Sequence, residues 1–324
     1  MMTRCCGFKG CNAPEVSCTN GEVDLADCPH WQATEESIDA DTEADVSVSV
    51  SGEFRFPWTG NAMGASDLGY LAGAATTRLV MLAGPADAGK TSLLAAIYLL
   101  MARGISAEDV RFAGSLTLEG WENIASNLRW SSPQGPSFPA HTSSGAGRHP
   151  GLLHLSLRMP TKTCEFLAAD APGEWFTEWA INKHAQQAEG VRWLADCSDV
   201  LLVIADSQAL VGAQRGQARK GLIDLLRRVG AERLGRPVAL VWTKCDVVVS
   251  TEMTTAIQEA ANRALLDFVE FHVSMHPAED AAKQHHGQGI IELLRWILTT
   301  SSRVYEFPPD EVPEGALLRL FRRA

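Results

Sequence analysis

The sequence predicts an α/β protein, a three-layer sandwich in which helices cover both faces of a mostly parallel sheet. From residue 77 onward, short apolar segments alternate with longer segments of helical periodicity, a pattern typical of strands joined by crossover helices. Several of the apolar segments are continuous, as expected of strands buried on both faces. The chain of 324 residues is 46% hydrophobic and 21% charged, which suits a protein with a sizeable core.

The expected elements follow from these segments. We expect strands at Arg78–Ala83, Leu152–Leu157, Cys164–Ala169, Val200–Ala205, Val238–Trp242 and Phe271–Ser274. We expect helices at Lys90–Ala102, Phe176–Ala195, Gly216–Val229, Thr251–Phe268 and Gly289–Leu298. An insertion at residues 104–150 separates the first helix from the second strand, and it is expected to hold a short helix around Glu119–Leu128 before a loop rich in Pro, Gly and Ser.

Composition divides the chain into four parts. Residues 1–32 form a cysteine-rich head, and residues 33–76 form an acidic linker with an irregular lead-in, within which 46–56 alternate like an exposed strand. Residues 77–300 form the α/β domain, and residues 301–324 form a C-terminal tail.

Charge and hydropathy narrow the class of protein. Residues 1–50 contain two basic and ten acidic residues, so −8 of the net charge of −11 lies there. This segment would repel phosphates, so we expect no nucleic-acid partner. No apolar run approaches the ~20 residues needed to span a bilayer, and no signal peptide is recognisable at the N-terminus. We therefore expect a soluble, cytoplasmic protein without a membrane span.

A glycine-rich segment directly follows the first strand. Residues 84–91, GPADAGKT, fit the pattern G-x-x-x-x-G-K-[ST] between an apolar strand and an apolar helix. Gly84 and Gly89 allow the backbone to curl so that successive N–H groups point at phosphates. Lys90 is expected to contact the β- and γ-phosphates, and Thr91 to offer its hydroxyl to Mg²⁺. A chance match in an ordinary strand–turn–helix is the alternative, which this context disfavours.

A second motif, DAPG at residues 170–173, follows the third expected strand. Asp170 at the end of this strand is expected to serve the Mg²⁺ site, and the N–H of Gly173 to reach the γ-phosphate. Asp206, at the end of the next strand, is a rival for the metal carboxylate. We favour Asp170 because a glycine follows it at the right spacing, which leaves Asp206 to a turn.

A third motif, TKCD at residues 243–246, follows the strand Val238–Trp242. Guanine presents two adjacent donors that one carboxylate, Asp246, can accept, whereas adenine lacks this pair. Lys244 is expected to lie along the purine face. A solvated turn is the alternative. The expected nucleotide contacts are Gly84, Asp87, Ala88, Gly89, Lys90, Thr91, Ser92, Thr243, Lys244, Asp246, Ser274 and Met275.

GPADAGKT, DAPG, TKCD and a Ser274-Met275 loop stand in one order at strand ends, and in this respect the chain resembles the TRAFAC class of P-loop GTPases, which contains the Ras-like switches. The resemblance covers about residues 77–300. The cysteine-rich head, the insertion and the phrase FLAADAPGEWF further resemble the double-GTPase branch of bacterial conflict systems. The resemblance implies a Ras-like P-loop NTPase sheet, Mg²⁺-dependent GTP hydrolysis to GDP and phosphate, and two switch segments.

The chain departs from this class at three points, in the interval before Asp170, at Glu174 and at Asp87. The interval between Lys90 and Asp170 is long, so the position of the first switch cannot be read directly from the motifs. Its metal-binding threonine is best placed at Thr142; the alternative is that Thr142 is an ordinary threonine of a flexible loop. Glu174 stands where relatives orient the attacking water, so the expected catalytic residues are Lys90, Gly173 and Glu174, with slow hydrolysis in the absence of a partner. Arg148 is a candidate arginine finger. Asp87 adds a carboxylate to an anion-binding loop, which suggests a monovalent cation nearby.

The cysteine-rich head is the remaining candidate site. Five of the eight cysteines lie in the first 28 residues, and Cys6, Cys11, Cys18 and Cys28 could complete a tetrahedral zinc site. The spacing lacks paired C-x₂-C motifs, so reduced cysteines in a partly ordered tail remain the alternative. A segment this short needs a bound metal or a covalent cross-link to fold, which favours zinc.

The function predicted from these motifs is a GTP-dependent switch that signals to an unidentified protein effector or activator. Its cofactors are then Mg²⁺ with GTP or GDP, and zinc in the head. Two alternatives stay open, a P-loop ATPase and a scaffold that holds nucleotide without hydrolysing it.

Overall fold

The computed structural model describes residues 61–71, 73, 75–105, 109–126, 128–129, 150–275 and 288–301, together with 4–6, 28–29 and 31–33 near the N-terminus. The chain divides into two compact units, Met1–Phe54 and Arg55–Ala324. In the first unit, β1 (Arg4–Cys6) pairs antiparallel with β2 (Trp31–Ala33). Within the described ranges, no helix is both long and apolar enough to cross a membrane.

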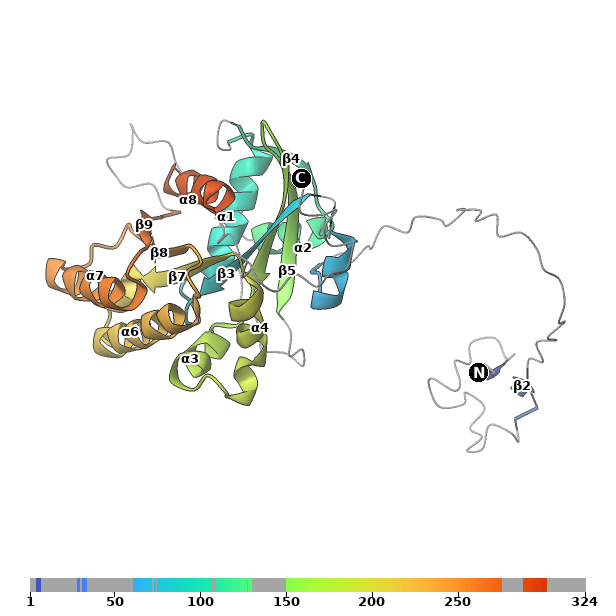
Figure 1. Cartoon of the computed structure of the whole chain (residues 1–324), viewed down its shortest axis with the longest axis horizontal. Coiled ribbons are helices and arrows are strands. Elements are labelled where there is room, and N and C mark those ends of the chain that lie inside the picture. The colour runs from blue at the N-terminus through green and yellow to red at the C-terminus, as the bar shows by residue number, and fades with distance from the viewer. Residues whose placement is uncertain are drawn as a thin grey trace, which may run out of the picture. The chain divides into compact units, whose positions relative to one another are not determined.

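The second unit is built on a seven-stranded sheet in the order β4-β5-β6-β3-β7-β8-β9 (Figure 1). The five strands from β6 to β9 run parallel, and β5 and β4 complete the other edge in antiparallel pairing. The fold class predicted from the sequence is confirmed. The strands are β3 (Thr76–Ala83), β4 (Arg111–Gly114), β5 (Gly151–Arg158), β6 (Thr163–Asp170), β7 (Val200–Asp206), β8 (Val238–Thr243) and β9 (Val269–His272).

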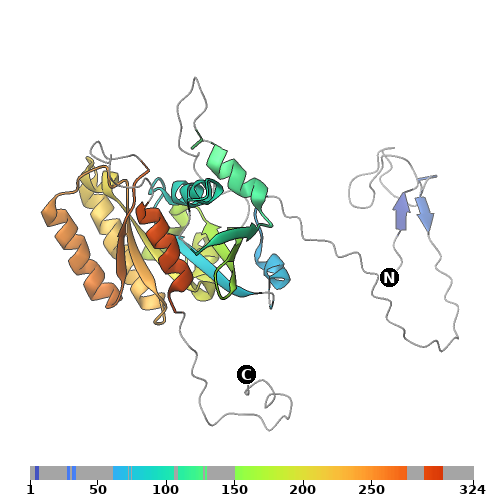
Figure 2. The ribbon, with the colours of Figure 1, turned by 90° about the horizontal axis from the view of Figure 1, so that it is seen from above.

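Helices cover both faces of this sheet (Figure 2). One apolar core lies beneath α1 (Lys90–Ala102), α2 (Leu118–Ser126) and α8 (Gln288–Thr299). The other core includes Trp175, Phe176 and Trp179, and it lies beneath α3 (Gly173–Ile181), α4 (Glu189–Cys197), α6 (Arg215–Glu232) and α7 (Thr251–Leu265). The short elements are η2 (Ala65–Tyr70), η3 (Gln186–Ala188) and α5 (Ser207–Val211).

The prediction of one continuous helix at Phe176–Ala195 is wrong, because the structure divides this segment into α3 and α4. Asn182 adopts an extended conformation, and its side-chain oxygen accepts a hydrogen bond from the N–H of His184 at 3.0 Å, which closes a turn. Arg192 fixes the same turn by donating to the carbonyls of Lys183 and Ala185. Apolar periodicity continues across the break and conceals it.

Strand β4 and helix α5 are among the short elements that the sequence did not predict. Strand β4 is brief and largely exposed, so it carries no clear alternation. Helix α5 holds only five residues and is nucleated by Asp206, whose side chain accepts from the N–H groups of Gln208 and Ala209. The last strand, expected at Phe271–Ser274, lies two residues earlier at Val269–His272.

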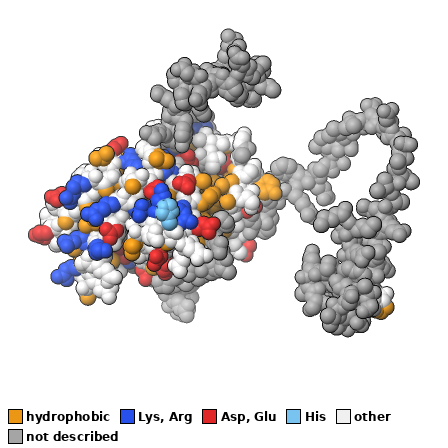
Figure 3. Space-filling view, turned by 60° about the horizontal axis from the view of Figure 1, so that its bottom comes forward, with side chains coloured by type: hydrophobic (Ala, Val, Ile, Leu, Met, Phe, Trp, Pro, Cys, Tyr) orange, Lys and Arg blue, Asp and Glu red, His pale blue; other side chains and the backbone are white. Residues whose placement is uncertain are grey.

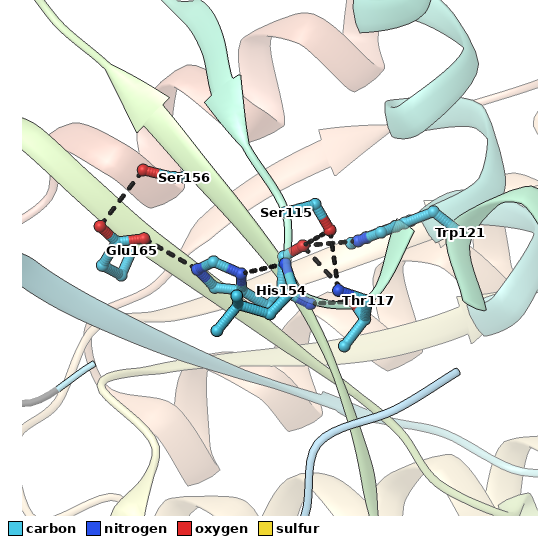
Figure 4. Close-up of polar contacts among 7 residues, drawn as sticks. Ser115, Thr117, Trp121, His154, Ser156 and Glu165 are labelled. Carbon is cyan, nitrogen blue, oxygen red and sulfur yellow. Dashed lines mark hydrogen bonds and ion pairs between the residues drawn. The ribbon is translucent and has the colours of Figure 1, made fainter. Parts of the chain in front are cut away.

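A buried polar cluster joins the segment between β4 and α2 to the sheet (Figure 4). His154 on β5 is 3% exposed, and its Nε2 lies 2.8 Å from a carboxylate oxygen of Glu165 on β6. Its Nδ1 accepts from the N–H of Leu116 at 3.0 Å, so the ring is neutral and its proton lies on Nε2. Burial lowers the pKa of His154 against the opposing effect of Glu165.

The backbone carbonyl of His154 completes this cluster. It accepts from Ser115 Oγ at 2.7 Å and from the indole N–H of Trp121 at 2.8 Å. Thr117 Oγ1 accepts from the N–H of His154 at 2.8 Å. The cluster therefore secures the start of α2 against β5.

Candidate nucleotide-binding site

The loops that follow β3, β6, β8 and β9 meet at one end of the sheet around a cavity of about 580 Å³. This position follows from topology, because the carboxyl ends of parallel strands share one edge. The volume lies within the usual range for small-molecule sites. The residues expected from the sequence that line it are Asp87, Ala88, Gly89, Lys90, Thr91, Ser92, Gly173, Glu174, Thr243, Lys244, Asp246, Ser274 and Met275.

The loop between β3 and α1 curls around the amino end of α1. Gly89 has a left-handed φ of 85°, a conformation that favours glycine. The ammonium of Lys90 donates to the carbonyls of Gly84 at 3.0 Å and Pro85 at 2.8 Å. Burial lowers the pKa of Lys90 to about 8, opposed by the carboxylates of Asp170, Glu174 and Asp87. A buried, partly desolvated cation at a helix amino terminus suits the binding of phosphate.

An oxygen pair suited to a hard divalent cation lies beside this loop. Thr91 Oγ1 donates to Asp170 Oδ1 at 2.8 Å, although the two residues are 79 positions apart. A hydroxyl and a carboxylate are ligand types that Mg²⁺ prefers. These side chains therefore fit a magnesium ion held between α1 and the end of β6.

Gly173 begins α3 in direct contact with the loop after β3. A Cβ atom added at Gly173 would lie 2.0 Å from the backbone nitrogen of Ala86, so only glycine fits this position. Glu174 follows in the first turn of α3, exposed and lining the cavity. The segment 170–174 is thus packed closely on the phosphate-binding loop.

The TKCD segment is hydrogen-bonded to the phosphate-binding loop at residues 84–91. Thr243 Oγ1 donates to the carbonyl of Ala88 at 2.8 Å. The hydroxyl of Ser274 donates to Asp246 Oδ1 at 2.8 Å, so the loop after β9 orients the carboxylate expected to recognise the base. Lys244 has a left-handed φ of 54°, which is strained for a lysine.

Asp206 has a role that the sequence did not reveal. Its Oδ2 accepts from the ammonium of Lys244 at 2.8 Å, and its Oδ1 caps α5. It therefore supports the TKCD segment, whereas Asp170 is the carboxylate that contacts Thr91. Gln208 of α5 also lines the cavity and was missed. The sequence feature that could have identified Asp206 and Gln208 is the position of Asp206 at the end of an apolar strand, because Gln208 follows it directly and the next strand ends in TKCD.

Several expected residues lie outside the described part of the chain. Thr142 and Arg148 of the insertion are among them, as are Cys11 and Cys18 of the head. Cys28 is described and buried, and of Cys6 only the backbone is described. Among the residues that the structure describes, no group of three or more potential metal ligands occurs.

The fold and the cavity together define a P-loop nucleotide-binding protein, in which a strand–loop–helix cradle meets a candidate base-recognition segment. The Double-GTPase 2 family model matches residues 78–297, and the chain belongs to this family. No curated protein is similar enough to match the chain.

Three solved structures are similar at low identity. Era in complex with MgGDPNP and nucleotides 1506-1542 of 16S ribosomal RNA is 16% identical, with a TM-score of 0.35 over 74% of this chain and 63% of that chain. Era from Aquifex aeolicus bound to GDP·AlF₄⁻ is 16% identical, with a TM-score of 0.35 over 76% and 64%. A protein from Thermus thermophilus is 21% identical, with a TM-score of 0.30 over 60% and 22%. The chain spans less than two thirds of each of these proteins.

Proposed function

We propose that this member of the family binds GTP with Mg²⁺ and hydrolyses it to GDP and phosphate. One observation carries the proposal: a single cavity is lined by Lys90 and Thr91, by Gly173 and Glu174, and by the TKCD segment. These are the three groups that phosphoryl transfer and guanine selection require.

Each group has a task in this proposal. Lys90 and the loop amides neutralise the phosphates, and the helix dipole of α1 adds to this field. Thr91 and Asp170 hold Mg²⁺, which supplies charge neutralisation when bound. Asp246, oriented by Ser274, accepts from the two guanine donors, and Lys244 covers the purine face.

Glu174 is the residue that we assign to orientation of the attacking water. It lines the cavity in the first turn of α3, near enough to raise the pKa of Lys90. A carboxylate also repels the γ-phosphate, so intrinsic hydrolysis is slow and a partner accelerates it. The partner is a protein effector or activator to which the nucleotide state is signalled.

The base site is tested by comparing wild type with Asp246→Asn for GTP, XTP and ATP. We expect wild type to prefer GTP, and the variant to weaken GTP binding and gain XTP binding, because its amide side chain suits the xanthine base. Equal binding of ATP and GTP, unaffected by the substitution, would favour the ATPase alternative.

Hydrolysis is tested in a single-turnover experiment with wild type and Glu174→Ala. We expect slow release of phosphate from wild type and a further loss in the variant. If no phosphate is released with or without a partner, the chain is a scaffold that only holds nucleotide.

Further assignments rest on the sequence and family resemblance. Cys6, Cys11, Cys18 and Cys28 bind zinc in a head spanning 1–32, which is tested by metal analysis of the full chain and of a chain lacking this head.

Asp87 helps to hold a monovalent cation, an idea that fails if hydrolysis is indifferent to exchange of K⁺ for Na⁺. A role in bacterial conflict is tested by phage challenge of cells expressing wild type or Lys90→Ala.

A further inference from the structure

The side chain of Lys90 is enclosed by the protein, which is unusual for a cation. Lys and Arg side chains are frequent on the surface of the domain (Figure 3), whereas Lys90 is only 7% exposed. Among the described residues, Arg78 is the other buried cation, and it lies near the amino end of β3, away from the phosphate-binding loop. Removing an ammonium from water is costly, so the contacts that it makes inside the protein have to compensate.

The phosphate-binding loop itself provides two of these contacts. The ammonium donates to the carbonyls of Gly84 at 3.0 Å and Pro85 at 2.8 Å. A lysine ammonium carries three N–H groups. The loop therefore leaves one N–H group of Lys90 for contacts outside it.

The aromatic ring of Phe176 supplies a contact from outside the loop. The ammonium nitrogen of Lys90 lies 5.8 Å from the centre of this ring, within the ~6 Å range of a cation–π interaction. Phe176 is 1% exposed, and such an interaction is strongest where the cation and the ring are both removed from water. The ring thus stabilises the ammonium at a place from which water is largely excluded.

The first turn of α3 fixes the position of this ring. Helix α3 begins at Gly173, where an added Cβ atom would lie 2.0 Å from the backbone nitrogen of Ala86. Phe176 follows three positions later, so it lies on the same side of the helix as Gly173. Phe176 and Trp179 also belong to the apolar core on this face of the sheet. The surroundings of the Lys90 ammonium therefore depend on how α3 packs against the loop.

We propose that Phe176 is a positioning residue of the nucleotide site, whose ring holds the ammonium of Lys90 beside the cavity, so that the packing of α3 sets the affinity for nucleotide. This inference rests on the proposed function, in which Lys90 contacts the β- and γ-phosphates. A lysine side chain loses rotamer freedom when it binds a phosphate. A ring that holds the ammonium in place removes part of this cost before the nucleotide binds. An aliphatic side chain of similar size cannot do so, because it lacks the negative face of an aromatic ring.

The test separates the aromatic face of residue 176 from its volume. We would introduce 4-fluoro-, 3,5-difluoro- and 3,4,5-trifluorophenylalanine at position 176 of the full chain, since each fluorine weakens the negative face of the ring with little change in size. Phe176→Leu removes the ring and keeps an apolar side chain. The matched control is the same fluorinated series at Phe166 on β6, which is also 1% exposed and does not line the nucleotide cavity.

Affinity is measured with Mg²⁺ by displacement of a fluorescent nucleotide, using non-hydrolysable analogues of GTP and of ATP. We expect the affinity for the GTP analogue to fall stepwise with each fluorine at position 176, by ~5-fold in total, and by ~10-fold in Phe176→Leu. The series at position 166 should stay within ~2-fold of wild type. In Lys90→Met, fluorination at position 176 should have no effect, because the ring then has no cation to hold.

A flat series at position 176 would overturn the proposal even if Phe176→Leu binds weakly, because a loss in that variant alone reflects packing. A stepwise loss that persists in Lys90→Met would also overturn it, since the ring would then act without the cation. So would tighter binding by the fluorinated variants, because the ring would then compete with phosphate for the ammonium. A preference of wild type for the ATP analogue would contradict the proposed function alone, because both nucleotides carry the phosphates that Lys90 contacts and the series tests Phe176 with either.

Discussion

The nucleotide cavity and the His154–Glu165 cluster are both polar, but they are built in opposite ways. In the cavity, Lys90 is a buried cation that donates hydrogen bonds to two backbone carbonyls, and it lines a volume of about 580 Å³. In the cluster, both ring nitrogens of His154 and its backbone N–H and carbonyl have partners inside the protein. A cluster satisfied internally stabilises the fold, whereas a cavity that faces solvent with a desolvated cation is prepared for a ligand.

This difference predicts that substitutions in the two regions have separate effects. Changes in the cavity should alter nucleotide binding and leave stability nearly constant. Changes in the cluster should do the reverse.

Substitution Lys90→Ala should have the largest effect. We expect the single-turnover rate of GTP hydrolysis to fall by about 10²–10³-fold, as when one donor to a transition state is removed. The free energy of unfolding of the nucleotide-free protein should change by less than about 1 kcal/mol, because a desolvated ammonium is lost together with its hydrogen bonds. Urea denaturation measures this quantity. Lys183→Ala, outside both regions, is the control for rate.

Substitution His154→Ala should lower the free energy of unfolding by about 3 kcal/mol, since it removes the hydrogen bond of the imidazole to the buried Glu165 carboxylate and its hydrogen bond from the N–H of Leu116. Ser156→Ala removes only one bond of 3.2 Å to Glu165 and should cost about 1 kcal/mol. The GTP affinity of both variants should stay within about twofold of wild type, provided that the fold is intact. A large loss of affinity in folded His154→Ala would show that the cluster acts on the nucleotide site.

The two regions should also respond to different pH ranges. Because the pKa of Lys90 is lowered to about 8, its ammonium deprotonates above pH 8 and GTP affinity should fall about tenfold between pH 7 and pH 9. Over the same range, Lys90 is protonated more in the unfolded chain, so its contribution to stability rises with pH.

The pKa of His154 is lowered, so its contribution to stability should be lost as pH falls below about 6.5. Isothermal titration and thermal melts in matched buffers measure these slopes, and the variants Lys90→Ala and His154→Ala should lack the respective slope.

Substitution Asp206→Asn should have the smallest effect, about a fivefold loss in GTP affinity. The amide oxygen can still cap α5, but the charge that holds the ammonium of Lys244 is lost. Asp224→Asn, which removes an exposed ion pair to Lys220, serves as the control and should leave GTP affinity unchanged. An equal loss in both variants would indicate a general electrostatic effect instead of positioning of Lys244.

Much of the fold and the outline of the site follow from the sequence because their signals are local. The strand β3, the loop at residues 84–91 and helix α1 are consecutive, and their apolar run and glycines indicate each element directly. The same holds for TKCD after β8, where one apolar strand ends in the polar residues that line the cavity. The break between α3 and α4 could not be predicted from the sequence. Hydrogen bonds of Asn182 and Arg192 fix it, and apolar periodicity carries no information about such hydrogen bonds.

The sequence by itself therefore determined the class of sheet, the phosphate-binding loop and the order of the motifs, since each depends on neighbouring residues. Only the tertiary structure decided that Asp206 binds Lys244, that His154 is paired with Glu165, and that an aromatic ring of α3 lies beside the lysine of the phosphate-binding loop. These contacts depend on how strands and helices remote in sequence pack together. Side chains 38 positions apart, such as Asp206 and Lys244, meet because β7 and β8 are paired in register in the finished sheet.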